Sequence, residues 1–326
     1  MNYDIIGDIH GHSEKLRQLL LSLGYKERGG AFRHSSRKAM FVGDFVDRGP
    51  GQIATLDVVR RMIEADSAEA VLGNHEFNAI AFATPHPLKD GEYLRRHTES
   101  NVHQHHRFLE EVGLNSQTHK SWIEFFMQLP MFVEKDDFRV VHACWHQPSI
   151  DNLKGLLTED NKLTSELMLA GSTKGTVEFE SLETLCKGIE IDLPEGLSYN
   201  DENGISRTRT RVRWWDEQAE TYKAAAIASK VTQEQLPEEL IPDECKMTYD
   251  KIKPVFFGHY WFSGQPRILN NYSCCVDYCA AHDEKPLVAY RWEGDPELKS
   301  ENLVSVGGIL VPEHIRRPPS SPFKMR

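Results

Sequence analysis

Short apolar runs alternate with amphipathic stretches over roughly the first 80 residues. The apolar runs at 3–6, 39–42 and 70–72 are each followed by Gly-Asp or Gly-Asn. After the first run, apolar side chains recur at helical spacing, as Leu16 and Leu20 do. Strands that alternate with helices predict an α/β fold with largely parallel strand pairing. Ligands bind such sheets at the carboxyl ends of the strands, which is where these polar signatures lie.

The chain beyond this repeat carries helix, hairpin and strand signals. Residues 94–129 are predicted to be helical, with a break near Gly113. Residues 131–144 are predicted to form a β-hairpin. Further strands are predicted at 255–257, 273–276 and 287–292.

The polarity of the chain predicts one core that is interrupted by an insertion. Residues 151–253 are polar and charge-rich, with scattered Gly and Pro, and we expect them to form an insertion that makes a rim or cap. The core then comprises 1–150 and 254–310. The tail at 311–326 is rich in Pro and Arg and is expected to be poorly ordered.

The composition excludes several classes of protein. The 326 residues carry 38 Lys and Arg against 49 Asp and Glu, a formal net charge of −11. Such an acidic chain is not suited to general nucleic-acid binding, so it must concentrate cations or metal wherever it holds an anion. No apolar run is long enough to cross a membrane. Six scattered cysteines do not make a disulfide framework, and we expect a reducing, cytoplasmic location.

Five short segments carry the candidate chemistry, and each follows a strand-like run. They are Gly-Asp-Ile-His-Gly at 7–11, Gly-Asp-Phe-Val-Asp-Arg-Gly at 43–49, Gly-Asn-His-Glu at 73–76, Val-His at 141–142 and Gly-His at 258–259. Carboxylate, amide oxygen and neutral imidazole are ligands for first-row divalent metals. Any one segment alone is weak evidence, since an isolated Asp-x-His is usually a turn. All five at strand ends together indicate a metal site.

The six candidate ligands are Asp8, His10, Asp44, Asn74, His142 and His259. Asp8 and His10 are alternate residues of an extended segment, so both side chains can hold one metal ion. Asp44 can bridge that ion to a second ion. Asn74, His142 and His259 would complete the site of the second ion. Two cations roughly 3.5–4 Å apart can polarise a shared water and stabilise in-line displacement at phosphorus. Manganese is our first expectation, and Fe, Zn, Co or Ni also suit these ligands.

The three N-terminal segments resemble those of calcineurin-like metallophosphoesterases, and within them the phosphoprotein phosphatase family. Gly-Asp-x-His-Gly, Gly-Asp-x-Val-Asp-Arg-Gly and Gly-Asn-His-Glu stand intact and in order. The likeness is strong over roughly 1–85, thinner at 140–146 and 255–280, and does not cover the insertion. It is shared with compact bacterial phosphatases of this type. The resemblance implies an α+β sandwich of two packed mixed β-sheets flanked by helices.

The resemblance also implies the same six metal ligands and a set of catalytic roles. His75 would be the general acid that protonates the leaving oxygen, and Asp47 would orient it. Arg48 and Asn74 would hold phosphate oxygens. A hydroxide that bridges the two metal ions would attack phosphorus directly, without a covalent enzyme intermediate.

Several readings of the substrate remain open. Symmetrical dinucleoside tetraphosphatases tend, by resemblance, to lack an aspartate at the position of Asp47, so its presence favours phosphate monoesters of proteins (Ser/Thr or Tyr) or of small molecules. The alternative is a nucleotide or symmetrical dinucleoside tetraphosphate hydrolase. A second alternative is an inactive metal-binding scaffold, although such a protein has no chemical need for His75 and Arg48.

Three further sets of residues are open to a structural or a functional reading. The alternating arginines Arg207, Arg209, Arg211 and Arg213 would share one face of a strand. In the structural interpretation, the four arginines form a solvated strand edge. In the functional interpretation, Arg211 and Arg213 reach the substrate phosphate. The histidines His97, His103, His105 and His106 are expected to line a solvated helix face. The aromatic residues Trp145, Tyr260, Trp261 and Phe262 either pack in the core or wall the pocket.

Overall fold

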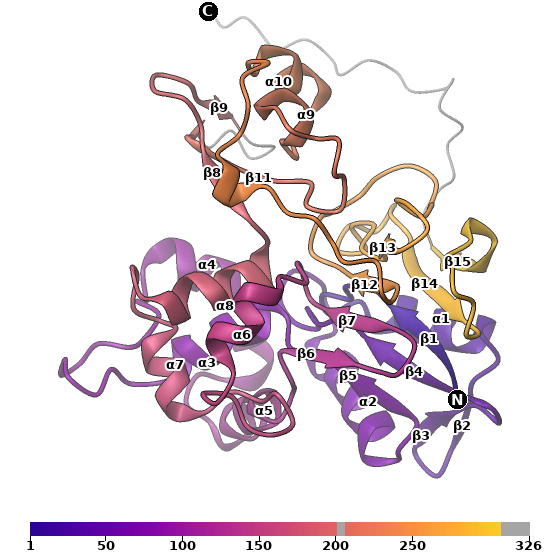
Figure 1. Cartoon of the computed structure of the whole chain (residues 1–326). Coiled ribbons are helices and arrows are strands. Elements are labelled where there is room, and N and C mark those ends of the chain that lie inside the picture. The colour runs from indigo at the N-terminus through magenta and orange to yellow at the C-terminus, as the bar shows by residue number, and fades with distance from the viewer. Residues whose placement is uncertain (201–205, 308–326) are drawn as a thin grey trace, which may run out of the picture.

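Two mixed β-sheets form the centre of the structure, a computed structural model that describes residues 1–200 and 206–307 (Figure 1). The first sheet has the order β15-β14-β1-β4-β5. Its strands are β1 (Asn2–Ile6), β4 (Arg37–Phe41), β5 (Ala68–Ala70), β14 (Leu287–Trp292) and β15 (Leu303–Val306). Strands β1, β4 and β5 pair in parallel, whereas β14 and β15 pair antiparallel. The predicted parallel repeat is confirmed, and the predicted tail at 311–326 lies outside the described residues.

The second sheet has the order β13-β12-β7-β6. Its strands are β6 (Phe132–Glu134), β7 (Arg139–Val141), β12 (Val255–Phe257) and β13 (Ser273–Cys275). Strand β12 lies parallel to both β7 and β13, and β6 and β7 form the predicted antiparallel hairpin. Both sheets therefore have parallel strands at their centre, and their carboxyl ends can meet at one edge.

Alternate residues of the strands fill the space between the two sheets. Tyr3 and Ile5 of β1 belong to one buried cluster with Phe138, Val140 and Phe256 from the second sheet. The Tyr3 and Phe138 rings lie 5.2 Å apart, edge to face. The expected fold of two packed mixed sheets flanked by helices is confirmed.

Helices cover the outer faces and follow the predicted spacing. The first five are α1 (Ser13–Ser22), α2 (Gln52–Glu64), α3 (Asn74–Ala83), α4 (Glu99–Val112) and α5 (Gln117–Met127). The predicted break near Gly113 is confirmed, because this residue ends α4 with a φ of 71°. The helix begins five residues later than predicted, since the Thr98 side chain accepts a hydrogen bond from the Asn101 N–H and caps it.

The polar middle of the chain folds into short elements. They are the helices α6 (Gln147–Leu153), α7 (Ser165–Ala170), α8 (Val177–Lys187), α9 (Tyr222–Ala225), α10 (Lys230–Gln235) and the 3-10 turn Asp243–Cys245, with the strands β8 (Glu190–Asp192), β9 (Tyr199–Asn200), β10 (Ser206–Arg207) and β11 (Arg209–Arg211). The small hairpin β2 (Lys26–Arg28) and β3 (Ala31–Arg33) and the 3-10 turn Ser300–Asn302 complete the described elements.

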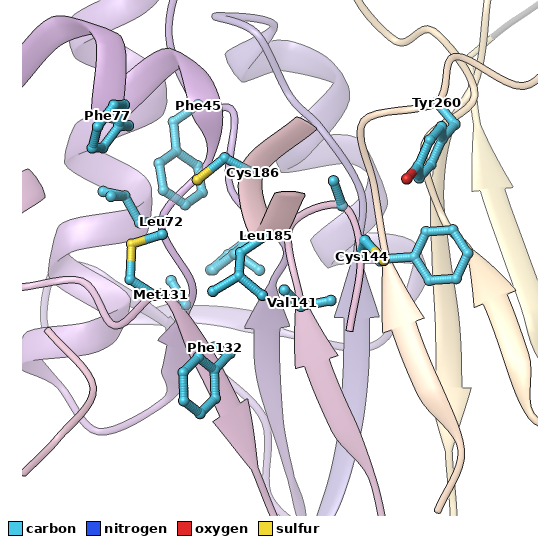
Figure 2. Close-up of a cluster of buried hydrophobic side chains, with 14 of the residues drawn as sticks. Phe45, Leu72, Phe77, Met131, Phe132, Val141, Cys144, Leu185, Cys186 and Tyr260 are labelled. Atoms are coloured by element: carbon cyan, nitrogen blue, oxygen red, sulfur yellow. The ribbon is translucent and has the colours of Figure 1, made fainter. Parts of the chain in front are cut away.

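Helix α8 packs on the end of the second sheet. Leu185 and Cys186 share one buried cluster with Val141 and Cys144 (Figure 2). The Leu185 carbonyl also accepts the Ala143 N–H at 3.0 Å. Helices α9 and α10, by contrast, stand away from both sheets (Figure 1). The division of the chain into a core and a cap at 151–253 stays a prediction.

In the described parts of the chain, no helix has both the length and the apolar character that a membrane span requires. The expected cytoplasmic location stays a prediction.

Candidate metal centre

The carboxyl ends of five strands from both sheets converge on one buried cluster. Asp8 and His10 follow β1, Asp44 follows β4, Asn74 follows β5, His142 follows β7 and His259 follows β12. All six side chains are buried except that of His259, which is partly exposed. The structure therefore brings together every ligand candidate that the sequence indicates.

Asp44 lies at the centre of this cluster. Its Oδ2 is 3.6 Å from His10 Nε2, and its Oδ1 is 3.4 Å from His142 Nε2. Two groups have the spacing of metal ligands, one of Asp44 with His10 and His75, the other of Asp44 with His142 and His259. Because both groups contain Asp44, its carboxylate is placed to bridge two ions.

Backbone carbonyls fix the orientation of two of the histidines. His10 Nδ1 lies 2.9 Å from the Val46 carbonyl oxygen, and His142 Nδ1 lies 2.7 Å from that of Val42. Each Nδ1–H donates to its carbonyl, which leaves the lone pair on Nε2, facing the cluster. This is the tautomer that binds a metal ion.

Buried polar atoms without partners show that divalent metals fit this site. Among the described residues, Asp8 Oδ1, His10 Nε2 and His259 Nε2 are buried and make no hydrogen bond. Burial raises the pKa of Asp8, and the charges of Asp277 and Asp44 raise it further, while the His259 N–H lowers it. Unsatisfied buried acceptors and crowded carboxylates are costly, and bound cations would satisfy both.

Glu76 ties the loop that follows β4 to the start of α3. Its carboxylate accepts the N–H groups of Asp44, Phe45, Val46 and Gly73 at 2.8–3.3 Å. Burial raises the pKa of Glu76 to about 7, and the charge of Asp44 contributes to this rise. The sequence motif contains Glu76 but assigns it no role. Its capping position, three residues after Gly73, was the available signal.

Strained backbone is concentrated at this cluster. Positive φ angles occur at the non-glycine residues His10, Asp44, Asp47, Arg48, His259 and Trp261. Such conformations cost roughly 1–3 kcal/mol each and persist only where the surroundings impose them. The ends of β4 and β5 also approach closely, since a Cβ on Gly43 would lie 2.5 Å from the Gly73 nitrogen. The site geometry is thus imposed by the fold.

His75 and Asp47 form a hydrogen-bonded pair beside the cluster. His75 Nδ1 lies 2.6 Å from Asp47 Oδ2, and His75 Nε2 lies 3.9 Å from Asp44 Oδ2. Burial lowers the pKa of His75, but the charge of Asp44 and the bond to Asp47 outweigh it, so the net pKa is raised. The pairing leaves Nε2 facing the ligand cluster.

The second oxygen of Asp47 is taken by His105, which the sequence reading missed. His105 Nδ1 lies 2.8 Å from Asp47 Oδ1, and His105 is only 4% exposed. The expectation of a solvated helix face holds for His103, which is exposed on α4, and in part for His106, which is half-buried. It is wrong for His105, and His97, although exposed, precedes the helix and contacts the Phe82 carbonyl. The apolar neighbours Phe108 and Val112, three and seven positions on, were the available signal, because they place His105 on the buried face of α4.

Arg48 lies exposed at the rim, with its guanidinium carbon 4.0 Å from the centre of the Trp261 ring. The backbone N–H of Trp261 donates to Asp277 Oδ2 at 2.8 Å, which holds this part of the chain next to the cation. Trp145 is a core residue, because it is buried and packs edge-to-face on Phe132. Trp261 is therefore the aromatic residue of that set that contacts a predicted substrate-binding side chain.

The prediction of one four-arginine strand face is wrong. Strand β10 ends at Arg207, and β11 covers only Arg209 and Arg211, so Arg213 lies outside it. Arg209 is exposed and pairs with two acids of β8, Asp192 at 3.1 Å and Glu190 at 3.5 Å.

The charge of Arg211 acts on one of the proposed metal ligands, His259. Its Nε donates to the Lys187 carbonyl at 2.9 Å, at the end of α8. Burial lowers the pKa of His259, and the charge of Arg211 lowers it further. Arg213 is partly buried. Burial lowers its pKa, and the charge of Asp216, which raises the pKa, only partly offsets this effect.

Comparison with known protein families adds one observation to this geometry. Residues 1–260 match the calcineurin-like phosphoesterase family. The chain belongs to the calcineurin-like phosphoesterases. It is therefore a hydrolase of phosphoesters, in a family whose members depend on a dinuclear metal centre. The family expected from the three N-terminal motifs is confirmed.

Several curated relatives of this calcineurin-like phosphoesterase share one name. This chain is 30% identical over 182 residues to the asymmetrical bis(5′-nucleosyl)-tetraphosphatase PrpE of Oceanobacillus iheyensis. The matched region covers 56% of this chain and 68% of that protein. It is 46% identical over 144 residues to the protein of that name from a Geobacillus species, covering 44% and 56%. With several others it shares only about a third of their length, such as 31% for Halalkalibacterium halodurans.

Solved structures give more distant likenesses. A putative diadenosine tetraphosphatase has 16% identity and a TM-score of 0.48, over 94% of each chain. A protein serine/threonine phosphatase of Saccharomyces cerevisiae has 13% identity and a TM-score of 0.45, over 96% of this chain and 82% of that one. Neither likeness says anything about the substrate of this phosphoesterase.

The shared position of Asp44 generates a test of the metal centre. We expect the native chain to bind two Mn²⁺ ions and Asp44→Asn to bind both more weakly. Mutating a residue that only hydrogen-bonds to a metal ligand lowers metal affinity about 10–100-fold. Loss of the shared ligand itself should therefore lower the affinity at least about tenfold. Equilibrium dialysis with elemental analysis measures this directly. His103→Gln, on the exposed face of α4, is the control, and two tightly held ions in Asp44→Asn would show that the cluster is not the metal site.

The contact between His105 and Asp47 generates a second test. His105→Leu should slow hydrolysis of phenyl phosphate on the order of tenfold and of p-nitrophenyl phosphate less, because only the poorer leaving group needs a well-placed proton donor. Metal content should not change.

A double-mutant cycle separates this role from a structural one. In a His75→Asn background the same His105 substitution should have no further effect on either ester, since the group it positions is absent. Equal losses for both esters and in both backgrounds would mean that His105 only supports the fold. His103→Leu serves as the matched control.

Proposed function

We propose that this phosphoesterase hydrolyses dinucleoside polyphosphates, with two divalent metal ions held by Asp8, His10, Asp44, Asn74, His142 and His259. The observation that supports the ligand set is the convergence of His10, His142 and His259 on Asp44, with acceptors left unpaired. Asp8 and Asn74 join this group through their contacts with His259. The name shared by the curated relatives supports the substrate class. Manganese is the first choice of metal for such nitrogen and oxygen ligands.

Each side chain near the centre has a distinct task in this proposal. Bound metal ions would activate a water molecule and neutralise phosphate oxygens. His75 Nε2 gives a proton to the oxygen that leaves phosphorus, and Asp47 holds the ring for that transfer. A water oxygen forms the new P–O bond as the bond to the bridging oxygen breaks. Arg48 and Asn74, with Arg211, hold the oxygens of the reacting phosphate.

This proposal departs from the phosphate monoester reading that Asp47 favoured. Asp47 favours phosphate monoesters only over symmetrical tetraphosphatases. The relatives reported above are named asymmetrical, so Asp47 gives no ground for preferring a protein phosphatase over them. Phosphoprotein hydrolysis remains the second candidate, because the pairing of His75 with Asp47 at 2.6 Å equally serves an alkoxide leaving group.

A comparison of substrates tests the proposed function. We expect the Mn²⁺-loaded chain to show its highest kcat/KM for a dinucleoside tetraphosphate and to release nucleoside monophosphate with nucleoside triphosphate. Phosphoserine peptide, phosphotyrosine peptide and a 5′-nucleotide are assayed beside it, and Asp8→Asn controls for contaminating phosphatases. A tenfold preference for either peptide would reject the dinucleotide proposal in favour of the second candidate.

Arg211 generates a further test of the proposed substrate contacts. Arg211→Gln should lower kcat/KM by about 10²-fold, the scale of losing one preorganised donor to the reacting phosphate. Metal content should stay at two ions. Arg209→Gln, on the same strand, is the matched control, because Arg209 is exposed and pairs with two acids, whereas Arg211 is half-buried and lies 3.7 Å from Glu190 alone. Arg213→Gln should have an intermediate effect. If Arg211→Gln changes kcat/KM by less than about twofold, Arg211 does not contact the substrate.

A further inference from the structure

The guanidinium of Arg48 has no polar partner in the part of the chain that the structure describes. Within residues 1–200 and 206–307, its side chain makes no hydrogen bond and no ion pair. A guanidinium has five N–H donors, so those of Arg48 are open to a bound anion. A long side chain without partners keeps its rotamer freedom, which it must give up when it binds a phosphate. A contact that restrains Arg48 beforehand would therefore favour binding.

One contact does restrain this side chain, and it is not a polar one. The guanidinium carbon of Arg48 lies 4.0 Å from the centre of the Trp261 ring, well inside the range of about 6 Å over which a ring face attracts a cation. The face of the ring needs no hydrogen bond to hold the cation, whereas a carboxylate partner takes up N–H donors. The charge of Arg48 is thus held in place without being neutralised.

The charge of Arg48 also acts on the proposed metal centre. Burial lowers the pKa of Arg48, and the charges of four acids act against this effect, namely Asp44, Asp47, Asp277 and Asp8. Two of these acids, Asp8 and Asp44, are proposed metal ligands. The cation therefore lies within electrostatic range of the centre, as its proposed role in holding the reacting phosphate requires.

The backbone fixes Trp261 in its turn. The N–H of Trp261 donates to Asp277 Oδ2 at 2.8 Å, and the N–H of Phe262 donates to the Asp277 carbonyl at 3.0 Å. Asp277 is 1% exposed, and its other carboxylate oxygen accepts the Cys279 N–H. Trp261 has a φ of 52°, a conformation that persists only where the surroundings impose it. The ring is therefore attached to a fixed backbone, two residues after the proposed ligand His259.

A second ring borders Trp261. The His282 ring meets it edge to face, with the two ring centres 6.2 Å apart. The segment of His282 is tied to α1, because Lys15 Nζ donates to the carbonyls of Ala280, His282 and Lys285 at 2.6–3.0 Å. Trp261 thus contacts two groups, the cation of Arg48 and a ring whose segment is held by α1.

We propose that Trp261 is a positioning residue, which holds the Arg48 guanidinium against its ring so that the N–H donors stay free for the reacting phosphate. The inference rests on the proposed role of Arg48 and makes the proposed function more specific at that one contact. It applies to dinucleoside polyphosphates and phosphate monoesters alike, since both have a reacting phosphate. The ring replaces a carboxylate that could otherwise orient the arginine, and so preserves positive charge that an acidic chain needs at this site.

Kinetics with p-nitrophenyl phosphate in the Mn²⁺-loaded chain test this role. Trp261→Leu removes the aromatic face but keeps an apolar side chain, and it should lower kcat/KM about five- to tenfold, in the range of one cation–π contact. The inhibition constant of inorganic phosphate should rise by a similar factor, because the same cation binds the product. Trp261→Phe keeps a ring face and should restore most of both losses. Metal content should not change.

A double-mutant cycle separates positioning from a structural role. In an Arg48→Gln background, Trp261→Leu should have no further effect, since the cation that the ring holds is absent. Phe125→Leu is the matched control, because this ring lies 5.8 Å from the Arg60 guanidinium, on helices α5 and α2, which carry no proposed ligand. Should Trp261→Leu fail to fold in a thermal melt, Trp261→Met gives the same test, since its flexible side chain fills space without an aromatic face.

The outcomes distinguish this inference from the proposed function. If Arg48→Gln leaves kcat/KM unchanged, the proposed role of Arg48 fails, and the positioning role of Trp261 fails with it. If Arg48→Gln lowers kcat/KM but Trp261→Leu does not, the proposed role of Arg48 stands and the inference is overturned. Equal losses from Trp261→Leu with and without Arg48 would overturn it too, because the ring would then act only on the fold.

Discussion

One buried carboxylate holds the metal-ligand cluster in shape. Glu76 accepts four backbone N–H groups, three from the loop after β4 and one from the turn after β5. That loop places Asp44 at a φ of 53°, a conformation that its own side chain does not favour. Without an acceptor, these N–H groups would be buried and unpaired, at a cost of about 1–3 kcal/mol each. The position of Asp44, the proposed shared ligand, therefore depends on Glu76, which is not itself one of the proposed ligands.

The cluster also depends on the packing of the two sheets. The first sheet supplies Asp8, His10, Asp44 and Asn74, and the second supplies His142 and His259. Asp44 reaches His142 only because Tyr3, Ile5 and Phe256 close the space between the sheets. Metal binding at such a site stabilises the packed state over any state in which the sheets are apart. The ions and the core thus support the same arrangement, although no side chain of that core is a ligand.

The sequence is sufficient to predict the parts of this site that lie in continuous segments. Three motifs at strand ends gave four of the six proposed ligands, because a strand and the turn after it are local structures. His105 could not be found in this way, since its contact with Asp47 joins residues 58 positions apart. The arginines from 207 to 213 failed for another reason. Their alternation predicts one strand, but that stretch breaks after Arg207 and pairs with β8 only from Arg209 to Arg211.

The arrangement of cations explains how an acidic chain can hold an anionic phosphoester. Arg48, Lys187 and Arg211 act electrostatically on the proposed metal ligands, and Arg95 acts on Asp47. These four side chains come from four different segments, and none of them is a metal ligand. A change in these cations can therefore alter which phosphates are held without removing any proposed metal ligand. Family membership fixes the reaction at phosphorus, whereas the residues around the rim decide what is attached to it.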